Sequence, residues 1–137
     1  MAVRITRVSE AAEILRAAHL FDEPPTPAGA QAFLDAPGHH LLVAHAGDEP
    51  AGFVTGVELR HPDKEPELFV YELGVDAAHQ RAGIAIELLT ALGKHVAGLG
   101  IRTLWTGTEP DNSAAQATYR RVGATAEPTT MFTWPAP

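Results

Sequence analysis

One stretch of the chain, residues 67–97, limits the possible folds more than any other. It begins with ELFVYELGV, a nearly continuous apolar run that is typical of a strand inside a sheet. The turn DAAHQRAG follows, and after it apolar side chains recur every three or four positions, at Ile84, Leu88, Leu92, Val96 and Leu99. This spacing predicts an amphipathic helix that starts near Gly83 and buries one stripe. The stretch is therefore predicted to be a strand–turn–helix unit packed on a sheet.

The remaining segments predict a mixed α/β fold. Their hydrophobic spacing favours helices at 10–21 and 28–36 and after residue 112, and strands at 3–8, 39–46, 51–59 and 101–108, with a last strand or bent pair within 124–134. Ser9 is the expected N-cap of the first helix, and Asn112 or Ser113 that of the last. The order β, α, α, β, β, β, α, β, α, β predicts a mixed sheet with helices on its faces. We expect residues 1–137 to form a single domain.

Composition excludes several classes of function. There is no cysteine, so a disulfide framework, a thiolate metal site and a cysteine nucleophile are excluded. The formal net charge of −7 disfavours nucleic acid, because phosphate binding needs clustered Lys and Arg. No apolar run approaches the ~20 residues of a membrane span. We expect a cytoplasmic protein with no nucleic-acid or membrane partner. The acidity could attract cations, or it could serve only solubility.

Neither the histidines nor the tryptophans predict a separate site. His39 and His40 are neighbours on a predicted strand, so they should face opposite sides, and the other histidines lie on separate elements without metal-ligand spacing. We therefore expect no metal site. Trp105 and Trp134 are expected in the core or in an interface rather than as platforms for stacking bases.

The turn at 80–85 is suited to an anion. A helix N-terminus presents unpaired N–H groups and a partial positive charge. Gly83 lets a ligand approach the backbone or lets the chain adopt a positive φ, and Arg81 adds a cation. The sequence lacks the Gly-Lys-Ser/Thr of a P-loop and the three glycines of a dinucleotide fingerprint. A phosphate or pyrophosphate site and an ordinary tight turn both stay open on these residues alone.

The same turn carries a family resemblance. The residues QRAGIA at 80–85 resemble the Q/R-x-x-G-x-G/A motif of the Gcn5-related N-acetyltransferases, the GNAT superfamily, which bind acetyl-CoA. YELGV before the turn looks like the central strand of that family, and DNSAAQATYRRVGA looks like its later segment. The resemblance implies the GNAT fold. That fold is a mixed, mostly antiparallel central sheet with a splay between its two central strands, flanked by about four helices.

Residue roles follow from the resemblance. Glu72 is the candidate general base or anchor of the amine, and Tyr119 is the candidate acid toward the sulfur of coenzyme A. The cofactor-binding residues are expected to be Leu73, Gly74, Val75, Gln80, Arg81, Ala82, Gly83, Ile84, Ala85 and Asn112. Other interpretations stay open: Glu72 could face solvent or pair with Arg60 or Lys64, Tyr119 could be a core residue, and Asn112 could only cap a helix.

A narrower resemblance concerns the acceptor. LFDE, the segment VTGVELRHPDKEPELFVYELGV and the short C-terminal tail are similar to aminoglycoside 3-N-acetyltransferases. This implies direct transfer of acetyl to a cationic aminoglycoside, held by Glu72 and by loop acids at Asp22, Glu23, Glu109 and Asp111. The alternatives are another small amine or a peptide N-terminus as acceptor, or a non-catalytic acyl-CoA-binding sensor. Because late strands often pair subunits in this family, the resemblance also implies a homodimer.

Overall fold

A computed structural model describes residues 3–137 and contains one five-stranded sheet. The strands follow one another across the sheet in chain order: β1 (Arg4–Arg7), β2 (His39–Ala46), β3 (Glu49–Leu59), β4 (Glu67–Val75) and β5 (Thr103–Trp105). The first four strands pair antiparallel, and β5 pairs parallel to β4. The predicted fold class, a mixed and mostly antiparallel sheet, is confirmed.

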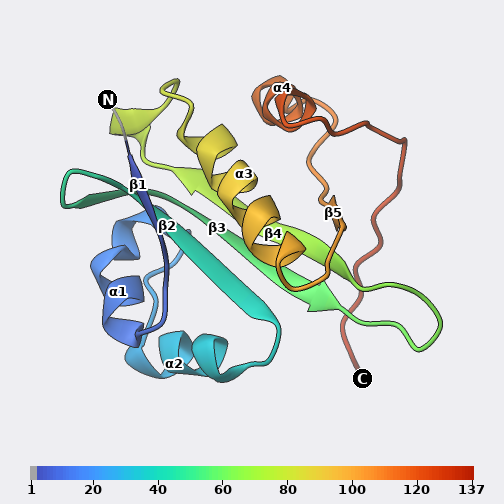
Figure 1. Cartoon of the computed structure of the whole chain (residues 1–137), viewed down its shortest axis with the longest axis horizontal. Helices are drawn as coiled ribbons and strands as arrows, with labels where there is room; N and C mark the ends of the chain where they lie inside the picture. The colour runs from blue at the N-terminus through green and yellow to red at the C-terminus, as the bar shows by residue number, and fades with distance from the viewer. Residues whose placement is uncertain (1–2) are drawn as a thin grey trace.

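Four α-helices flank this sheet (Figure 1). They are α1 (Ala11–Arg16), α2 (Pro27–Asp35), α3 (Ile84–Ala97) and α4 (Ser113–Arg121), with short 3₁₀ turns η1 (Ala18–Leu20) and η2 (Ala77–His79). In Figure 1, α3 crosses in front of β3 and β4, while α1 and α2 lie beside β1 and β2 at the lower left. The long helix and the two helices before β2 thus agree with the sequence pattern.

The strands divide the core between two faces of the sheet. Leu42 and Ala44 of β2 are buried in a cluster with the inner stripe of α3. Leu41 and Val43, which alternate with them, are buried in a second cluster with residues of α1 and α2. Because successive side chains of a strand point to opposite faces, helices cover β2 on both sides.

The buried stripe of α3 differs from the prediction at its last member. Ile84, Leu88, Leu92 and Val96 are buried, whereas Leu99 is 48% exposed. The helix ends at Ala97, and Gly100 then turns the chain with φ of 87°. Ile101 becomes buried instead, and its N–H donates to Val96 O at 3.0 Å. Because the chain turns at Gly100, the last buried residue of this apolar stripe is Ile101 instead of Leu99.

One of the two predicted helix caps is wrong. The N-cap of α1 is Glu10 rather than Ser9. The Glu13 carboxylate accepts hydrogen bonds from the N–H groups of Glu10 at 3.1 Å and Ser9 at 3.3 Å, which is the reciprocal half of a capping box centred on Glu10. Asn112 does cap α4, as predicted, because its Oδ1 accepts from Ala115 N at 3.0 Å.

The predicted last strand does not form. Residues 124–137 contain no helix or strand, and in Figure 1 the tail descends from α4 past β5 and ends at the lower right. A strand is stable only when its N–H and C=O groups pair with a neighbour, so apolar and β-branched residues are not sufficient. Met131, Phe132 and Trp134 are left 82%, 78% and 77% exposed.

Candidate active site

The sheet opens where β5 leaves β4. Their parallel pairing ends with Phe69 opposite Trp105, and the Thr106 hydroxyl donates to Val70 O at 2.7 Å just beyond it. From Tyr71 to Val75, β4 then has only β3 beside it among the described residues. The predicted splay therefore lies between β4 and β5, and it leaves one edge of Leu73, Gly74 and Val75 without a neighbouring strand.

A β-bulge lies at the start of this open edge. Thr55 of β3 pairs with Glu72, and the next residue, Gly56, pairs with Val70, so Tyr71 is an extra residue in β4. Residues directly opposite each other share a face of the sheet, which places the Glu72 side chain beside that of Thr55. The bulge leaves Tyr71 67% exposed.

Glu72 is half-buried, and no Lys, Arg or His among residues 3–137 forms an ion pair with it. Its backbone N–H donates to the Thr55 hydroxyl at 3.0 Å, and that hydroxyl lies 3.5 Å from Glu72 Oε1. Burial raises the pKa of Glu72, the nearby charge of Asp22 raises the pKa further, and the Thr55 hydroxyl partly opposes both effects. The alternative partner Arg60 is excluded, because it pairs with Glu58 at 2.6 Å.

The loop after η1 brings Asp22 toward Glu72. Phe21 packs on Phe53 of β3 with ring centroids 4.4 Å apart. Gly74 faces the same loop, since a Cβ at this position would lie 3.5 Å from Leu20 O and 2.9 Å from the Phe53 ring. Asp22 itself is exposed. The structure thus joins two acids that lie 50 positions apart in sequence, and only a small residue fits at Gly74 beneath the loop.

The turn before α3 has an open, left-handed backbone. Arg81 has φ of 65° and Gly83 has φ of 78°, with Gly83 as N-cap and its carbonyl accepting from Glu87 N at 3.1 Å. A Cβ on Gly83 would meet nothing within 4 Å, so the space above the turn is empty. Ile84 is 3% exposed and fixes the helix start to the core. The arrangement can therefore present several N–H groups to an anion.

The other predicted cofactor residues surround this turn. The Gln80 amide donates to Val75 O at 3.3 Å, which ties the turn to the end of β4. Ala82 is exposed and Ala85 half-buried, so neither obstructs the first turn of α3. Asn112 lies in another part of the chain, where its amide oxygen already caps α4.

Tyr119 and three of the four predicted loop acids do not contribute to the pKa shift of Glu72. Tyr119 is half-buried on α4 and packs against the core cluster beneath α3, as the core interpretation expected. Glu23 is exposed in the loop before α2, and Glu109 and Asp111 are exposed in the loop before α4. Of the four predicted acids, Asp22 is the one whose charge raises the pKa of Glu72.

Thr55 and the aromatic residues of this face were not among the predicted site residues. The Phe69 ring lies 4.5 Å from that of Trp105 and 5.6 Å from that of Tyr71, measured between centroids. Trp105 is 46% exposed and Trp134 77% exposed, so a place in the core is wrong for both, and a place in an interface stays a prediction. The sequence does mark Thr55 as unusual, because it is a lone hydroxyl in an apolar strand. Its pairing with Glu72, however, depends on the register of the two strands, which the sequence pattern does not give.

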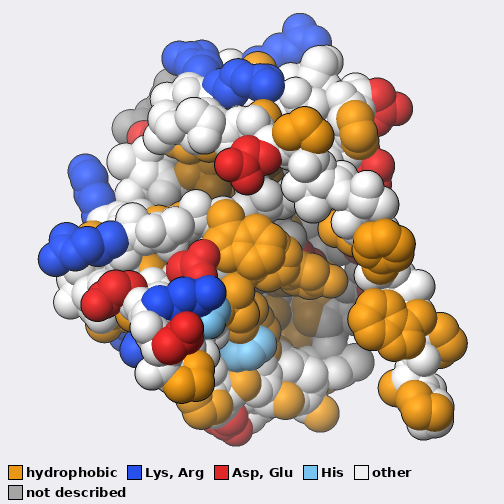
Figure 2. Space-filling view, turned by 90° about the vertical axis from the view of Figure 1, so that its right-hand side faces the viewer, with side chains coloured by type: hydrophobic (Ala, Val, Ile, Leu, Met, Phe, Trp, Pro, Cys, Tyr) orange, Lys and Arg blue, Asp and Glu red, His pale blue; other side chains and the backbone are white. Residues whose placement is uncertain are grey.

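The space-filling view shows the face at the side of β5 (Figure 2). Hydrophobic side chains gather in its middle, and a hollow lies below them. The C-terminal tail stands apart at the right, with hydrophobic side chains along it. Tyr71 and Trp105 are 67% and 46% exposed, and Met131, Phe132 and Trp134 of the tail are 77–82% exposed, so both groups offer apolar surface to a ligand or partner.

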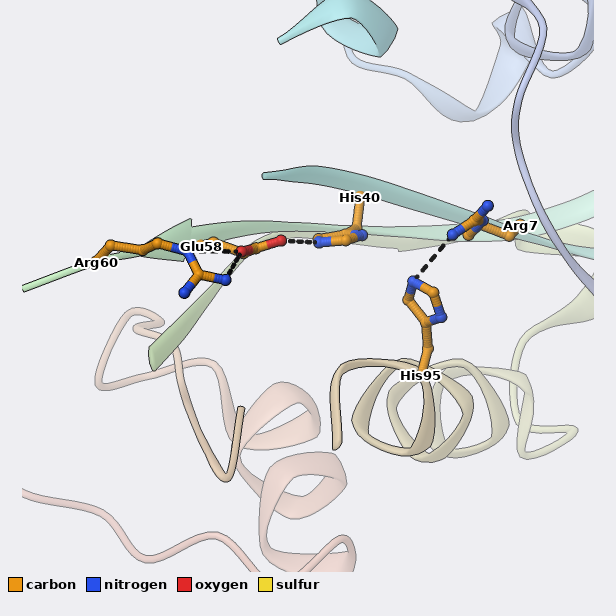
Figure 3. Close-up of polar contacts among 5 residues, drawn as sticks. All are labelled: Arg7, His40, Glu58, Arg60 and His95. Atoms are coloured by element: carbon orange, nitrogen blue, oxygen red, sulfur yellow. Dashed lines mark hydrogen bonds and ion pairs between the residues drawn. The ribbon is translucent and has the colours of Figure 1, made fainter. Parts of the chain in front are cut away.

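A second polar cluster joins Arg7, His40, Glu58, Arg60 and His95 (Figure 3). His40 Nε2 lies 2.7 Å from the Glu58 carboxylate, both side chains are only 11–12% exposed, and Arg60 binds the same carboxylate. The hydrogen bond from His40 is the main cause that lowers the pKa of Glu58. His95 of α3 contacts the His40 ring and accepts from Arg7 at 3.5 Å, and burial lowers its pKa. This cluster, the Glu58 network, ties β1, β2 and β3 to α3.

His39 and His40 do face opposite sides, since His39 packs edge-on against Phe33 of α2 and His40 against His95 of α3. Residues 3–137 contain no cluster of three or more acidic or histidine side chains with metal-binding geometry. None of their helices is long and apolar enough to span a membrane. Two hollows of ≈ 230 and ≈ 380 Å³ beside β1 contain none of the predicted site residues.

Comparison with known proteins places this geometry in a family. Residues 8–124 match the profile of the Acetyltransferase (GNAT) family. An aminoglycoside acetyltransferase from an uncultured soil metagenomic sample, in complex with sisomicin, superposes with a TM-score of 0.87 at 21% identity, covering 98% of this chain and 95% of that one. AAC(6')-Iy in complex with the bisubstrate analogue CoA-S-monomethyl-acetylneamine superposes with a TM-score of 0.82 at 18% identity, covering 99% of each chain. At these identities the likeness shows the fold alone.

Relatives by sequence have several different substrates in their names. The mycothiol acetyltransferase of Mycobacteroides abscessus is 48% identical over 65 residues, which are 47% of this chain and 22% of that protein. The L-2,4-diaminobutyric acid acetyltransferase of Shouchella clausii is 32% identical over 81 residues, 59% of this chain and 44% of that protein. The chain thus spans less than half the length of these curated relatives.

Proposed function

Because the chain belongs to the Acetyltransferase (GNAT) family, we propose that it transfers the acetyl group of acetyl-CoA to an amine. The observation that carries this proposal is Glu72, a half-buried carboxylate with a raised pKa, located where the sheet opens. A raised pKa brings a carboxylate closer to the pH at which it exchanges protons efficiently. A non-catalytic acyl-CoA-binding module has no use for such a group.

The residues of the splay and turn fit acetyl-CoA, which family members use as acyl donor and which supplies the activated thioester. The edge of Leu73, Gly74 and Val75 offers backbone groups to an extended, amide-containing chain. The turn at Arg81 and Gly83 offers N–H groups and empty space to a pyrophosphate. Gln80, Ala82, Ile84 and Ala85 complete the proposed cradle, and Asn112, at the start of α4, is proposed as a further contact of the cofactor.

Within this site, Glu72 takes the proton of the acceptor ammonium, directly or through water. Asp22 adds negative charge beside it, which favours a cationic acceptor over a neutral one. Backbone N–H groups of β4 near Leu73 to Val75, on its open edge, polarise the carbonyl under attack. Tyr119 Oη holds the proton that the departing thiolate requires. Positioning by these elements can contribute roughly 7–11 kcal/mol to lowering the barrier.

The acceptor that we favour is an aminoglycoside amine. Support comes from the acids Asp22 and Glu72, from the exposed rings of Tyr71 and Trp105 that contact Phe69 of β4, and from the folds of two aminoglycoside acetyltransferases. Aromatic faces attract ammonium groups and sugar rings. Glu23, Glu109 and Asp111 are proposed as outer contacts. The sequence resemblance favours the 3-amine, while one structural neighbour is named AAC(6')-Iy.

A second candidate is another small amine, such as a diamino acid, or a peptide N-terminus. The names of the sequence relatives favour it, since they include L-2,4-diaminobutyric acid and, for a 42% identical segment of 57 residues in Haemophilus ducreyi, the alanine of ribosomal protein bS18. Both candidates share the donor and the role of Glu72, and they differ only in the acceptor.

Thiol release from acetyl-CoA tests the proposal. The enzyme is mixed with gentamicin, with a panel of diamino acids, polyamines and peptides, or with buffer alone. Fast release with gentamicin supports the aminoglycoside, and mass spectrometry with NMR of the product then identifies the acetylated amine. Thiol release only with another amine would support acetyl transfer but exclude an aminoglycoside as the acceptor. Binding of acetyl-CoA without release from any amine would favour an acyl-CoA sensor.

We also propose that the protein is a homodimer in which the C-terminal tail packs on the second subunit. Met131, Phe132 and Trp134 are exposed on a single chain, and a contiguous apolar surface of this kind is uncommon on a monomer. Sedimentation equilibrium over a range of concentrations tests this. A monomer at high concentration would exclude the dimer. A cytoplasmic location stays a prediction of the sequence.

A further inference from the structure

We propose that the hydroxyl groups of Thr55 and Thr106 clamp the β4 bulge from its two sides and thereby fix the direction of the Glu72 carboxylate. This inference rests on the proposed role of Glu72. It concerns two residues outside the predicted site, Thr55 on β3 and Thr106 immediately after β5, on the two sides of β4. We name them positioning residues, since neither needs to touch the substrate.

Thr55 replaces a bond that the bulge removes from the ladder. Inserting Tyr71 shifts the register between Thr55 and Gly56, so the sheet cannot keep all its regular hydrogen bonds there. The Thr55 side chain is 2% exposed, and its oxygen accepts from Glu72 N at 3.0 Å. Once it accepts that bond, the hydroxyl has its proton left to donate, and Glu72 Oε1 at 3.5 Å is the acceptor in reach.

Thr106 acts on the other side of the bulge. Its hydroxyl donates to Val70 O at 2.7 Å, immediately after the last β4–β5 pair at Phe69 and Trp105. A backbone N–H in this position would continue the ladder, whereas a side-chain hydroxyl satisfies the carbonyl and lets β5 leave. Tyr71 is thus held between one bond at Val70 O and another at Glu72 N.

The clamp has a consequence for the carboxylate. Besides burial, two groups shift the pKa of Glu72: Asp22 from the loop after η1 and Thr55 from β3, and they shift it in opposite directions. Asp22 favours the protonated form, while the Thr55 hydroxyl favours the carboxylate. Thr55 therefore both aims the carboxylate and limits how far its pKa rises.

The test is a ¹³C NMR titration of carboxyl-labelled glutamate in the full chain, with the Glu72 signal assigned by its loss in Glu72→Gln. In Thr55→Val the pKa of Glu72 should rise above its wild-type value, while Thr55→Ser should titrate like wild type. Thr55→Ala replaces the valine variant if that protein does not fold. An unchanged Glu72 pKa in Thr55→Val, or equal behaviour of the serine and valine variants, would overturn the clamp.

Kinetics separate the two threonines. With the active acceptor, Thr55→Val should lower kcat by roughly 10- to 100-fold with a small change in KM for acetyl-CoA, and should move the acid limb of the pH profile upward. Thr106→Val should lower kcat without moving the pH profile, and Thr103→Val, an exposed neighbour on β5, should change neither. The titration requires no acceptor, so it tests the clamp even if acetyl transfer fails. If the titration of Thr55→Val gives the expected pKa shift but Glu72→Gln retains full turnover, the clamp stands and only the catalytic role of Glu72 is overturned.

Discussion

Two glutamates on neighbouring strands have opposite environments. Glu58 of β3 lies 2.7 Å from His40 and 2.6 Å from Arg60, and these partners lower its pKa. Glu72 of β4 has no Lys, Arg or His within ion-pair distance among residues 3–137, has Asp22 nearby, and has a raised pKa. Both carboxylates are removed in part from water, yet only one is neutralised.

The difference separates a structural carboxylate from a functional one. Burying a charge is costly unless it is paired, so a paired carboxylate such as Glu58 can be retained for its hydrogen bonds alone. An unpaired one such as Glu72 lowers the stability of the fold, and its presence is explained by what it does for a ligand. Four substitutions test how far this distinction extends.

The largest effect is expected for Glu72→Gln. Turnover should fall by roughly 10²- to 10⁴-fold, because the amide cannot accept the ammonium proton. The affinity for acetyl-CoA, measured by calorimetry, should not change. The free energy of unfolding at neutral pH should increase, since a neutral amide is easier to bury than a carboxylate. Wild-type turnover in this variant would remove Glu72 from the mechanism.

Glu58→Gln should have the opposite pattern. We expect the free energy of unfolding in urea to fall by about 1–3 kcal/mol, because hydrogen bonds between charged groups are lost in a mostly buried place. Affinity for acetyl-CoA should be retained. Arg60→Ala is the control: its side chain is 63% exposed, so its loss should cost much less. A Glu58→Gln protein as stable as wild type would mean that the Glu58 network does not stabilise the fold.

Gly83→Val tests the other half of the site. A β-branched residue at φ of 78° is strained by about 1–2 kcal/mol, and its side chain enters the space proposed for a pyrophosphate. Gly100→Val is a matched control, because Gly100 has φ of 87°, also has open space, and lies at the other end of α3. Both variants should lose similar stability, and only Gly83→Val should bind acetyl-CoA more weakly. Equal affinities would mean that this turn holds no phosphate.

The smallest effect is a pH dependence of stability. The pKa of His95 is lower in the folded protein than its ordinary value, so the unfolded chain binds more protons. The stability linked to His95 is therefore fully present above its unfolded pKa of ~6.5 and is lost as pH falls through that range. Glu58 acts in the same direction at lower pH, and Glu72 in the opposite direction. His95→Gln should flatten the curve of unfolding free energy between neutral and mildly acidic pH. An unchanged slope would contradict this assignment.

Local patterns were sufficient for most of the fold. The strands at 39–46 and 67–75 have the predicted bounds, because glycine, proline or polar residues flank runs of apolar residues there. The helix after Gly83 was also predictable from its period. The tail was not, since MFTW has the composition of a strand but forms none without a partner.

The site was predictable only in part, for a similar reason. A glycine at a helix start is visible in sequence, so the turn at Gly83 could be found. Asp22 and Thr55 act on Glu72 through the approach of a loop and through the register of a bulged strand, which are properties of the assembled sheet. Arg60 illustrates the same limit, because sequence allowed it to pair with either glutamate.

Because Trp105 lies where β5 separates from β4, its fluorescence can report on the opening between the two strands. The protein has two tryptophans, one stacked on Phe69 at the point where β5 leaves β4 and one in the tail. Trp134→Phe would leave a single fluorophore at the mouth of the site, half exposed to solvent. The wavelength and quenching of its emission would then report how the opening responds when ligands are added, in solution and without any label.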